Sequence, residues 1–144
     1  MSRFLLLSAM EASIKFIGEI QSPLKRIEEC PLQENENAPE ASITIFPEFI
    51  EGIKDIKVNT EILILTWLHK AGRAVLKCKP RNYTDVPEVG VFSTRSPDRP
   101  NPIGVHVAKV LSISKDGVIK VTALEALDKT PVIDIKPVIN KSHS

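Results

Sequence analysis

The sequence has 144 residues, of which 42% are hydrophobic and 26% charged, and its formal net charge is +1. These values are typical of one soluble globular domain with its own core, and they exclude a global charge that would attract nucleic acid or a membrane. Cys30 and Cys78 are the only cysteines, and their spacing indicates neither a disulfide framework nor a zinc site. The longest apolar run, Ile62 to Leu68, suits a core strand rather than a membrane span. We therefore expect a cytoplasmic protein with no metal and no membrane contact.

The first residues allow two interpretations. Arg3 followed by Phe4-Leu5-Leu6-Leu7 faintly resembles a signal peptide, but the apolar run is very short and no clean cleavage site follows it. Met10 favours the alternative, an upstream extension. We expect residues 1–13 to lie outside the core, residues 14–140 to form the domain and residues 141–144 to be a tail.

The first half of the domain is predicted to join strands by polar connections. Ile14–Ile20 reads as a strand that ends at Ser22-Pro23, and the polar, acidic stretch Leu24–Glu40 reads as a long loop. Ala41–Phe46 alternates as a strand does. Phe46–Ile53 suggests a short helix, because proline at its second residue suits a first helical position.

A buried central strand is predicted next, over Glu61–Leu68, ending at His69-Lys70. From Gly72 the pattern alternates again, which predicts another strand with Ala74, Leu76 and Cys78 on one face. The segment Lys70–Arg81 carries five basic residues and no acidic one. It therefore forms either a phosphate-binding face or the solvated outer face of one strand.

The last third predicts a long hairpin and a final strand. Ile103–Ser114 and Val118–Leu127 flank an Asp-Gly turn, which is a strong hairpin signal. A turn at Asp128–Pro131 then leads into a strand over Val132–Lys136. Strands outnumber helices, so we expect a single all-β domain, a β-barrel with a short helix and long loops.

The stretch Gly90–Gly104 runs as an apolar strand, then a loop with two arginines, three prolines and three hydroxyls, then a second apolar strand. Proline restricts itself and the residue before it, so this loop has little entropy to lose on binding. Rigid polar loops between strands are typical binding loops, although a rigid surface connection is the simpler alternative.

Several chemistries are excluded by the sequence. The six glycines lie far apart, so no glycine-rich dinucleotide or phosphate-binding loop exists. His69, Ser96 and Asp98 have the residue types of a hydrolytic triad, but nothing brings them together. The acidic residues near the loops have no spacing typical of a metal site.

Gly90–Gly104 closely resembles the signature loop of the TsaA/TrmO-like (YaeB-like) family of tRNA methyltransferases. Other segments resemble the same family in the same order: Phe16–Pro23 its opening strand, Phe46–Ile53 its short helix, Trp67–His69 a strand ending in histidine, and Leu127–Pro137 its last turn and strand. The resemblance spans about Ile14 to Ile139.

This resemblance implies a β-barrel unlike the Rossmann methyltransferases, usually assembled as a homodimer. It also implies an enzyme that binds S-adenosyl-L-methionine and methylates N6 of threonylcarbamoyladenosine (t6A) beside the tRNA anticodon. By position, the cofactor contacts expected from the family are Pro31, Gln33, His69, Lys70, Arg95, Val105, Leu127, Asp128, Lys129 and Thr130. The polar loop residues placed to meet the substrate are Ser93, Thr94, Ser96, Arg99 and Asn101.

The chemistry of these residue types suits the implied roles. Arg95 or backbone N–H groups of the rigid loop would bind the cofactor's carboxylate, Asp128 its ribose hydroxyls or amino group, and Leu127 its adenine. His69 has a suitable ordinary pKa for a general base, and a structural role for it is an equal alternative.

Three residues depart from the family pattern: Lys129 replaces a glycine in the last turn, Val138 replaces a tyrosine, and Leu32 replaces an arginine. Longer family members carry a further C-terminal domain thought to help with tRNA, so cofactor binding is better supported than the tRNA substrate. The alternatives are a barrel that methylates another RNA or a small molecule, and a non-catalytic S-adenosylmethionine-binding regulatory protein.

Overall fold

A computed structural model describes residues 3–25, 39–80 and 85–139. Its elements, in chain order, are α1 (Arg3–Ser8), β1 (Gly18–Gln21), β2 (Ala41–Ile45), the 3-10 helix η2 (Pro47–Ile53), β3 (Glu61–Trp67), β4 (Lys77–Cys78), β5 (Val89–Gly90), the 3-10 helix η4 (Val91–Ser93), β6 (Ile103–Ile113), β7 (Val118–Val121) and β8 (Pro131–Pro137). Strands dominate, as the sequence predicts. No helix among the described residues is long and apolar enough to cross a membrane.

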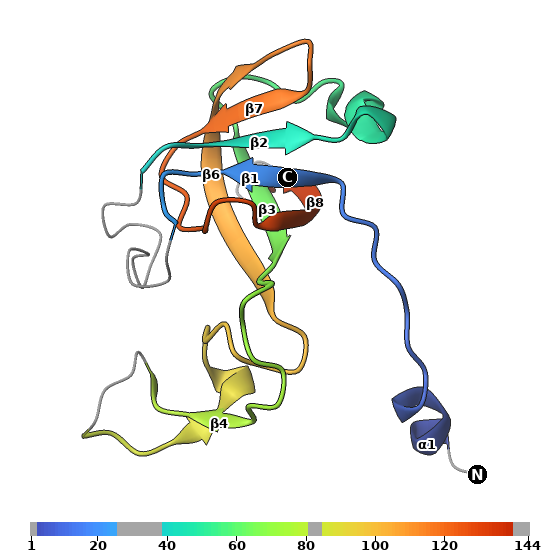
Figure 1. The fold of residues 1–144 in the computed structure, drawn as a ribbon, viewed down its shortest axis with the longest axis vertical. Coiled ribbons are helices and arrows are strands. Elements are labelled where there is room, and N and C mark those ends of the chain that lie inside the picture. The colour runs from blue at the N-terminus through green and yellow to red at the C-terminus, as the bar shows by residue number, and fades with distance from the viewer. Residues whose placement is uncertain (1–2, 26–38, 81–84, 140–144) are drawn as a thin grey trace.

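Six strands close into an antiparallel barrel in the order β1-β2-β7-β6-β3-β8, with β8 pairing back onto β1 (Figure 1). The long strand β6 closes much of the ring, since it pairs with β3 over Ile103–Lys109 and with β7 over Val110–Ile113. The turn between β6 and β7 contains Gly117 at φ 85°, a left-handed conformation that glycine adopts without strain. The predicted all-β barrel is confirmed.

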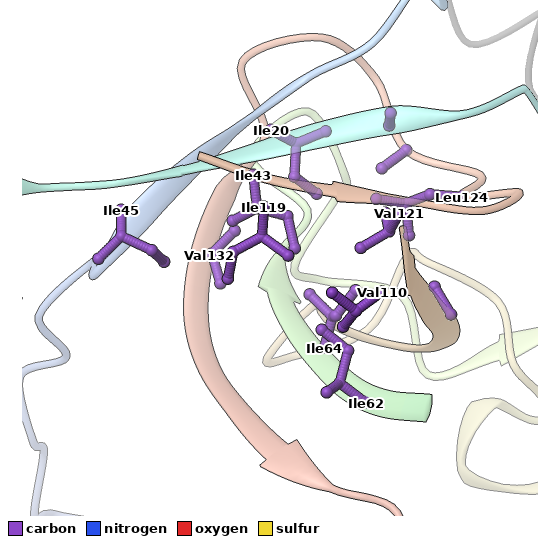
Figure 2. Packing of buried hydrophobic residues seen from close by; sticks show 13 residues of the cluster. Ile20, Ile43, Ile45, Ile62, Ile64, Val110, Ile119, Val121, Leu124 and Val132 are labelled. Carbon is purple, nitrogen blue, oxygen red and sulfur yellow. The ribbon is translucent and has the colours of Figure 1, made fainter. Parts of the chain in front are cut away.

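The core of the barrel is built from the inward-facing residues of the strands, because side chains alternate between the two faces. Figure 2 shows these side chains meeting inside the ring. The largest that are fully buried and apolar are Ile20, Ile43, Ile45, Ile64, Val91, Val110, Ile119, Val121, Leu124 and Val132, all of which except Val91 belong to this cluster. Burial of each contributes about 1.5–3 kcal/mol, so the core fixes the positions of the strand ends that carry the loops.

The strand registers define two ends of the barrel. At one end, which we call the rim, β1, β3 and β7 finish and β2, β6 and β8 begin, as the pairs Gln21–Ser42, Ala41–Val121 and Thr66–Gly104 require. The connection from β3 to β6, residues 68–102, extends away from the rim and carries β4, β5 and η4 (Figure 1). We call it the arm.

The prediction of a strand from Gly72 onward is wrong over most of its length. Only Lys77–Cys78 pairs with another strand, and that partner is β5 within the arm. The side chain of Leu76 is 62% exposed, because the arm offers no barrel face on which the apolar side of the pattern can pack.

Other boundaries also differ from the prediction. β1 begins only at Gly18, and Ile14 and Phe16 before it are exposed. β7 ends at Val121, since the chain then turns and Leu124 enters the core. The short helix at Pro47 has 3-10 geometry. Most of the predicted loop Leu24–Glu40 lies outside the described residues.

Candidate functional site

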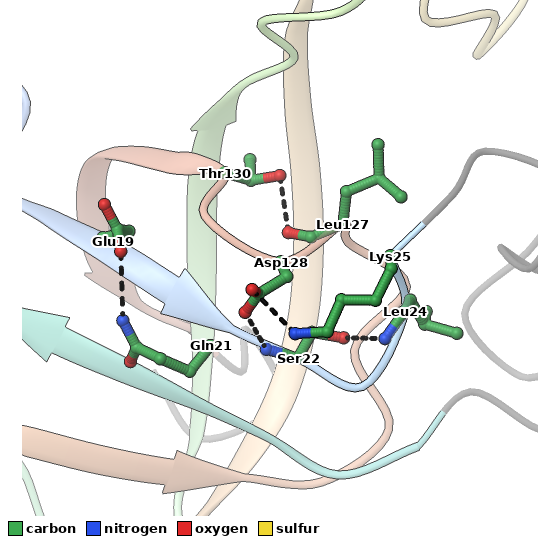
Figure 3. Close-up of polar contacts among 8 residues, drawn as sticks. All are labelled: Glu19, Gln21, Ser22, Leu24, Lys25, Leu127, Asp128 and Thr130. Atoms are coloured by element: carbon green, nitrogen blue, oxygen red, sulfur yellow. Dashed lines mark hydrogen bonds and ion pairs between the residues drawn. The ribbon is translucent and has the colours of Figure 1, made fainter.

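The turn between β7 and β8 is tied to the end of β1 by an aspartate. Oδ1 of Asp128 accepts a hydrogen bond from the Ser22 amide at 2.9 Å, and Oδ2 lies 2.8 Å from Nζ of Lys25 (Figure 3). The Lys25 ammonium and the Ser22 amide lower the pKa of Asp128. Its carboxylate is therefore ionised at neutral pH and fixed at the rim.

Lys129, the residue after this aspartate, has φ 68°, a left-handed conformation that favours glycine. Its amide donates to the Ile20 carbonyl at 2.7 Å, which holds the turn against β1. The buried hydroxyl of Thr130 donates to the Leu127 carbonyl at 2.8 Å (Figure 3). The turn therefore has the conformation that suits the family's glycine, although a lysine occupies the position.

An open cavity of about 590 Å³ lies beside this turn. It is lined by Gln21, Ser22, Pro23, Lys25, Glu40, Ala41, Ser42, Lys120 and Asp128. Its wall carries both carboxylates and ammonium groups, which suits a polar ligand that bears both charges.

The signature loop of the arm is held together by Arg99. Its Nε donates to the Ser96 carbonyl at 2.9 Å, and its Nη2 donates to the carbonyls of Val91 at 2.7 Å and Thr94 at 2.5 Å. The Thr94 hydroxyl also donates to the Val91 carbonyl, at 2.8 Å. Arg99 and Thr94 therefore shape the loop, while Ser93 lies exposed on it.

A second set of contacts joins the loop to the turn that follows β3. Oδ1 of Asp98 accepts from the Gly72 amide at 2.8 Å. Arg73 donates from Nε to the Pro100 carbonyl at 2.7 Å and from Nη2 to Oδ1 of Asn101 at 3.1 Å. Its guanidinium also lies 5.2 Å from the centre of the Trp67 ring. Arg73 thus connects the loop to the end of β3.

Arg95 is the arginine of the loop that reaches the start of β6. Its Nη2 donates to the carbonyl of Val105 at 3.1 Å, and the rest of its side chain is exposed. Behind it, inside the barrel, the Thr66 hydroxyl lies 3.0 Å from Nε2 of His106. Burial, and secondarily the Arg95 charge, lower the pKa of His106 to about 4, so this histidine is neutral at pH 7.

His69 and Lys70 follow β3 directly and are both exposed. Partial burial and the neighbouring Lys70 charge lower the pKa of His69. A neutral imidazole at pH 7 is the form that can accept a proton.

Residues 19–144 match the family model described as the tRNA-methyltransferase O N-terminal domain. The chain belongs to the tRNA-methyltransferase O family. The family predicted from the sequence is therefore confirmed, and so is the fold that it implies.

Similar proteins and solved structures cover nearly the whole chain. A probable S-adenosyl-L-methionine-binding protein of Methanothermobacter thermautotrophicus is 40% identical over 131 residues, 91% of this chain and 93% of that protein. A protein of Archaeoglobus fulgidus with the same description is 46% identical over 129 residues, 89% of this chain and 34% of that protein. The crystal structure of TrmO from Pseudomonas aeruginosa has a TM-score of 0.72 at 28% identity, and covers 90% of this chain and 57% of that one.

The chain therefore spans about a third of the Archaeoglobus fulgidus relative and little more than half of the solved TrmO chain. It matches nearly the full length of the Methanothermobacter thermautotrophicus relative.

The contacts expected from the tRNA-methyltransferase O family lie on separate connections at the rim. His69 and Lys70 follow β3, Val105 lies near the start of β6 with Arg95 against it, and residues 127–130 precede β8. Pro31 and Gln33 lie outside the described residues. Asn101 and Thr94 are engaged within the arm. No group of three metal-ligating side chains occurs in the described ranges.

Sequence reasoning missed three sets of contacts that shape this site. Ser22 and Lys25 bind Asp128, Arg73 ties the arm to β3, and Thr66 pairs with His106. The only sequence signal for the Ser22–Asp128 contact was the Ser-Pro pair at the end of the opening strand. That pattern marks a turn but does not show that a distant aspartate binds it.

Proposed function

We propose that this chain binds S-adenosyl-L-methionine at the rim and transfers its methyl group to an RNA nucleobase, the N6 nitrogen of t6A in tRNA. The observation that carries the proposal is the gathering at one end of the barrel of the described residues expected from the family to contact the cofactor. Relatives named as S-adenosyl-L-methionine-binding proteins, 40–46% identical to this chain, support the cofactor.

The donor set at the rim fits this cofactor, which carries a carboxylate, an ammonium, ribose hydroxyls and an adenine. Asp128 presents a fixed carboxylate whose oxygens each retain accepting capacity for a hydroxyl or ammonium. The exposed guanidinium of Arg95 is suited to a carboxylate. Leu127, half-buried beside the turn, offers an apolar surface for the adenine.

The bound cofactor supplies an electrophilic methyl group for in-line displacement. Rigid residues then contribute chiefly by positioning the acceptor, and Arg99 and Arg73 give the arm that rigidity. His69 is proposed as the group that accepts the proton from the acceptor nitrogen, since its lowered pKa keeps it neutral at pH 7.

A basic surface on the arm supports an RNA substrate. Lys70, Arg73, Lys77, Lys79 and Arg95 are exposed there. Contacts between such side chains and phosphates release counterions, so tRNA binding should weaken as salt rises. A tRNA substrate also implies that the protein acts in the cytoplasm.

We also propose a homodimer, formed through the outer face of β3 and β6. Leu63, Leu65 and Trp67 on β3 pair with Val107, Val105 and Ile103 on β6. The three β6 residues are 36–39% exposed, so they form an apolar stripe on the outside of the barrel. Such a stripe next to a binding site is suited to a second copy that carries the same stripe.

Calorimetric titration with S-adenosyl-L-methionine, with ATP as the control ligand, tests the proposal first. We expect specific binding, weakened about 10–100-fold by Arg95→Ala, because a charge-assisted hydrogen bond is lost. The matched variant Lys115→Ala, in the β6–β7 turn at the other end of the barrel, should bind as the wild type does. Unchanged affinity in Arg95→Ala would remove this arginine from the site.

A methyl-transfer assay on tRNA with and without t6A then separates the proposed reaction from its alternatives. Transfer that depends on t6A supports the full proposal. Cofactor binding without a tRNA effect favours another RNA or a small molecule as acceptor, and binding without turnover favours a regulatory protein. The last alternative has one observation in its favour, since the curated relatives are described only as binding proteins.

A further inference from the structure

A second cavity lies at the end of the barrel opposite the rim. Its volume is about 870 Å³, and we call it the distal groove. Half-buried apolar side chains from the β1 entry, η2 and β8, among them Ile17, Phe49, Ile53 and Ile135, line it. Of the residues expected to bind the cofactor, none that the structure describes contributes to its wall.

The chain also carries a short helix whose apolar side chains are exposed. α1 contains Phe4-Leu5-Leu6-Leu7, whose side chains are 51–82% exposed, and Met10 after it is 68% exposed. A helix of six residues is too short to be stable alone in water, and a helix that is apolar on several sides requires cover. A contiguous exposed apolar surface of this kind marks an interaction site.

The positions of helix and groove point to exchange between molecules. Ile17 is both a wall of the distal groove and the root of the segment that carries α1. Residues 9–16 have no regular secondary structure, are exposed, and run away from their own barrel (Figure 1). Eight residues, fully extended, reach about 26–29 Å, which allows the helix to contact a surface well away from its own barrel.

Charge and symmetry agree with this arrangement. The lining of the distal groove includes five carboxylates, Glu48, Glu51, Asp55, Glu61 and Asp134, against three lysines, Lys54, Lys57 and Lys136. Arg3, at the start of α1, complements that excess of negative charge. Because each copy has one helix and one groove, reciprocal exchange between two copies closes without leaving either surface exposed.

We propose that α1 of one copy of this chain docks in the distal groove of a second copy. The contact holds two chains together at the end of the barrel remote from the rim. It does not depend on cofactor or RNA binding.

Site-directed disulfide formation between two different variants tests the exchange. In a Cys30→Ser, Cys78→Ser background, one protein carries Leu6→Cys and the other Gly52→Cys. Gly52 lies in the groove wall, and a Cβ added there meets no atom within 4 Å, so the cysteine fits. Val58→Cys replaces the groove cysteine in the matched control, since Val58 is exposed outside the groove.

We expect the Leu6→Cys and Gly52→Cys proteins, mixed and oxidised, to form a mixed dimer at several times the yield of the Val58→Cys control. Equal yields, or no mixed dimer, would overturn the proposal. So would a double variant of Leu6→Cys with Gly52→Cys that closes its disulfide only within one chain, because the helix would then occupy its own groove. Circular dichroism checks that each variant is folded. Cofactor titration of the same proteins reports separately on the rim.

Discussion

Thr66 and His106 form a buried polar pair inside the barrel, with 3.0 Å between the threonine hydroxyl and Nε2 of the histidine. Both residues are buried, with 0% of Thr66 and 2% of His106 exposed. The pair lies on neighbouring strands next to the first residues of β6, so the start of that strand depends on a histidine that stays uncharged. Burial lowers its pKa to about 4.

Acid should therefore destabilise the fold through His106. Well above pH 6.5 the histidine is neutral in both states. At lower pH the unfolded chain binds a proton at this histidine, whereas the folded chain does not bind it until about pH 4. The loss amounts to at most about 3 kcal/mol over this window. Urea unfolding at pH 7.5 and pH 4.5 should show a smaller loss in His106→Gln than in the wild type. Equal losses would mean that the histidine is not held neutral.

Gly104 should resist substitution, because a Cβ at this position would clash with the Thr66 hydroxyl oxygen and lie 2.9 Å from Nε2 of His106. Gly104→Ala is expected to lower the free energy of unfolding by about 1–3 kcal/mol through overpacking. Gly90→Ala is the control, since a Cβ there meets nothing within 4 Å. Denaturant unfolding measures the free energy of unfolding of both variants. A similar loss in Gly104→Ala and Gly90→Ala would show that Gly104 is not crowded by Thr66 and His106.

Lys129 is a position where glycine should improve the fold. Its φ of 68° costs a lysine more than a glycine, so Lys129→Gly should raise the free energy of unfolding by about 0.5–1 kcal/mol. Asn59→Gly, at φ 70°, should gain less, because asparagine tolerates this conformation. A loss of stability in Lys129→Gly would show that the lysine side chain stabilises the fold by more than its left-handed backbone conformation destabilises it.

Arg99 is expected to be structural rather than ligand-binding. Arg99→Ala leaves the carbonyls of Val91, Thr94 and Ser96 without their guanidinium, which should cost about 1–3 kcal/mol and make the arm more sensitive to limited proteolysis. Arg99→Lys should not restore the loop, because one ammonium cannot reproduce the planar fork. Lys77→Ala, on the same arm, serves as control, and an unaltered digestion pattern in Arg99→Ala would refute the role.

Much of the barrel was predictable from local patterns. The alternation over Ala41–Phe46, the Asp-Gly turn and the strand over Val132–Lys136 all reflect local sequence that agrees with the final packing. The strand predicted after Gly72 was mostly wrong, because its local pattern does not agree with the final packing. It alternates equally well, but its apolar residues face no core, and Leu76 is left exposed. Alternation reports a preference for a pleated surface and does not say whether such a surface is present.

The candidate site was predicted only through resemblance, and the roles of its residues stay predictions. Residues 127–130, Arg95 and His69 are separated by long stretches of sequence, and their common location at the rim follows from strand order, which no local pattern contains. The Thr66–His106 pair was missed because register between distant strands decides which polar residues meet. The strain at Lys129 was visible, since a lysine stood where the family has glycine.

Trp67 and Ile103, where the arm leaves and rejoins the barrel, are directly paired neighbours. The arm between them is thus an insertion at a single point of the barrel. Changes of length or composition in residues 68–102 need not alter the registers that close the ring. Evolution can therefore vary the chemistry of the arm while the barrel that folds around the core stays the same. For the same reason, a protein engineer can exchange arms between relatives at the Trp67–Ile103 pair.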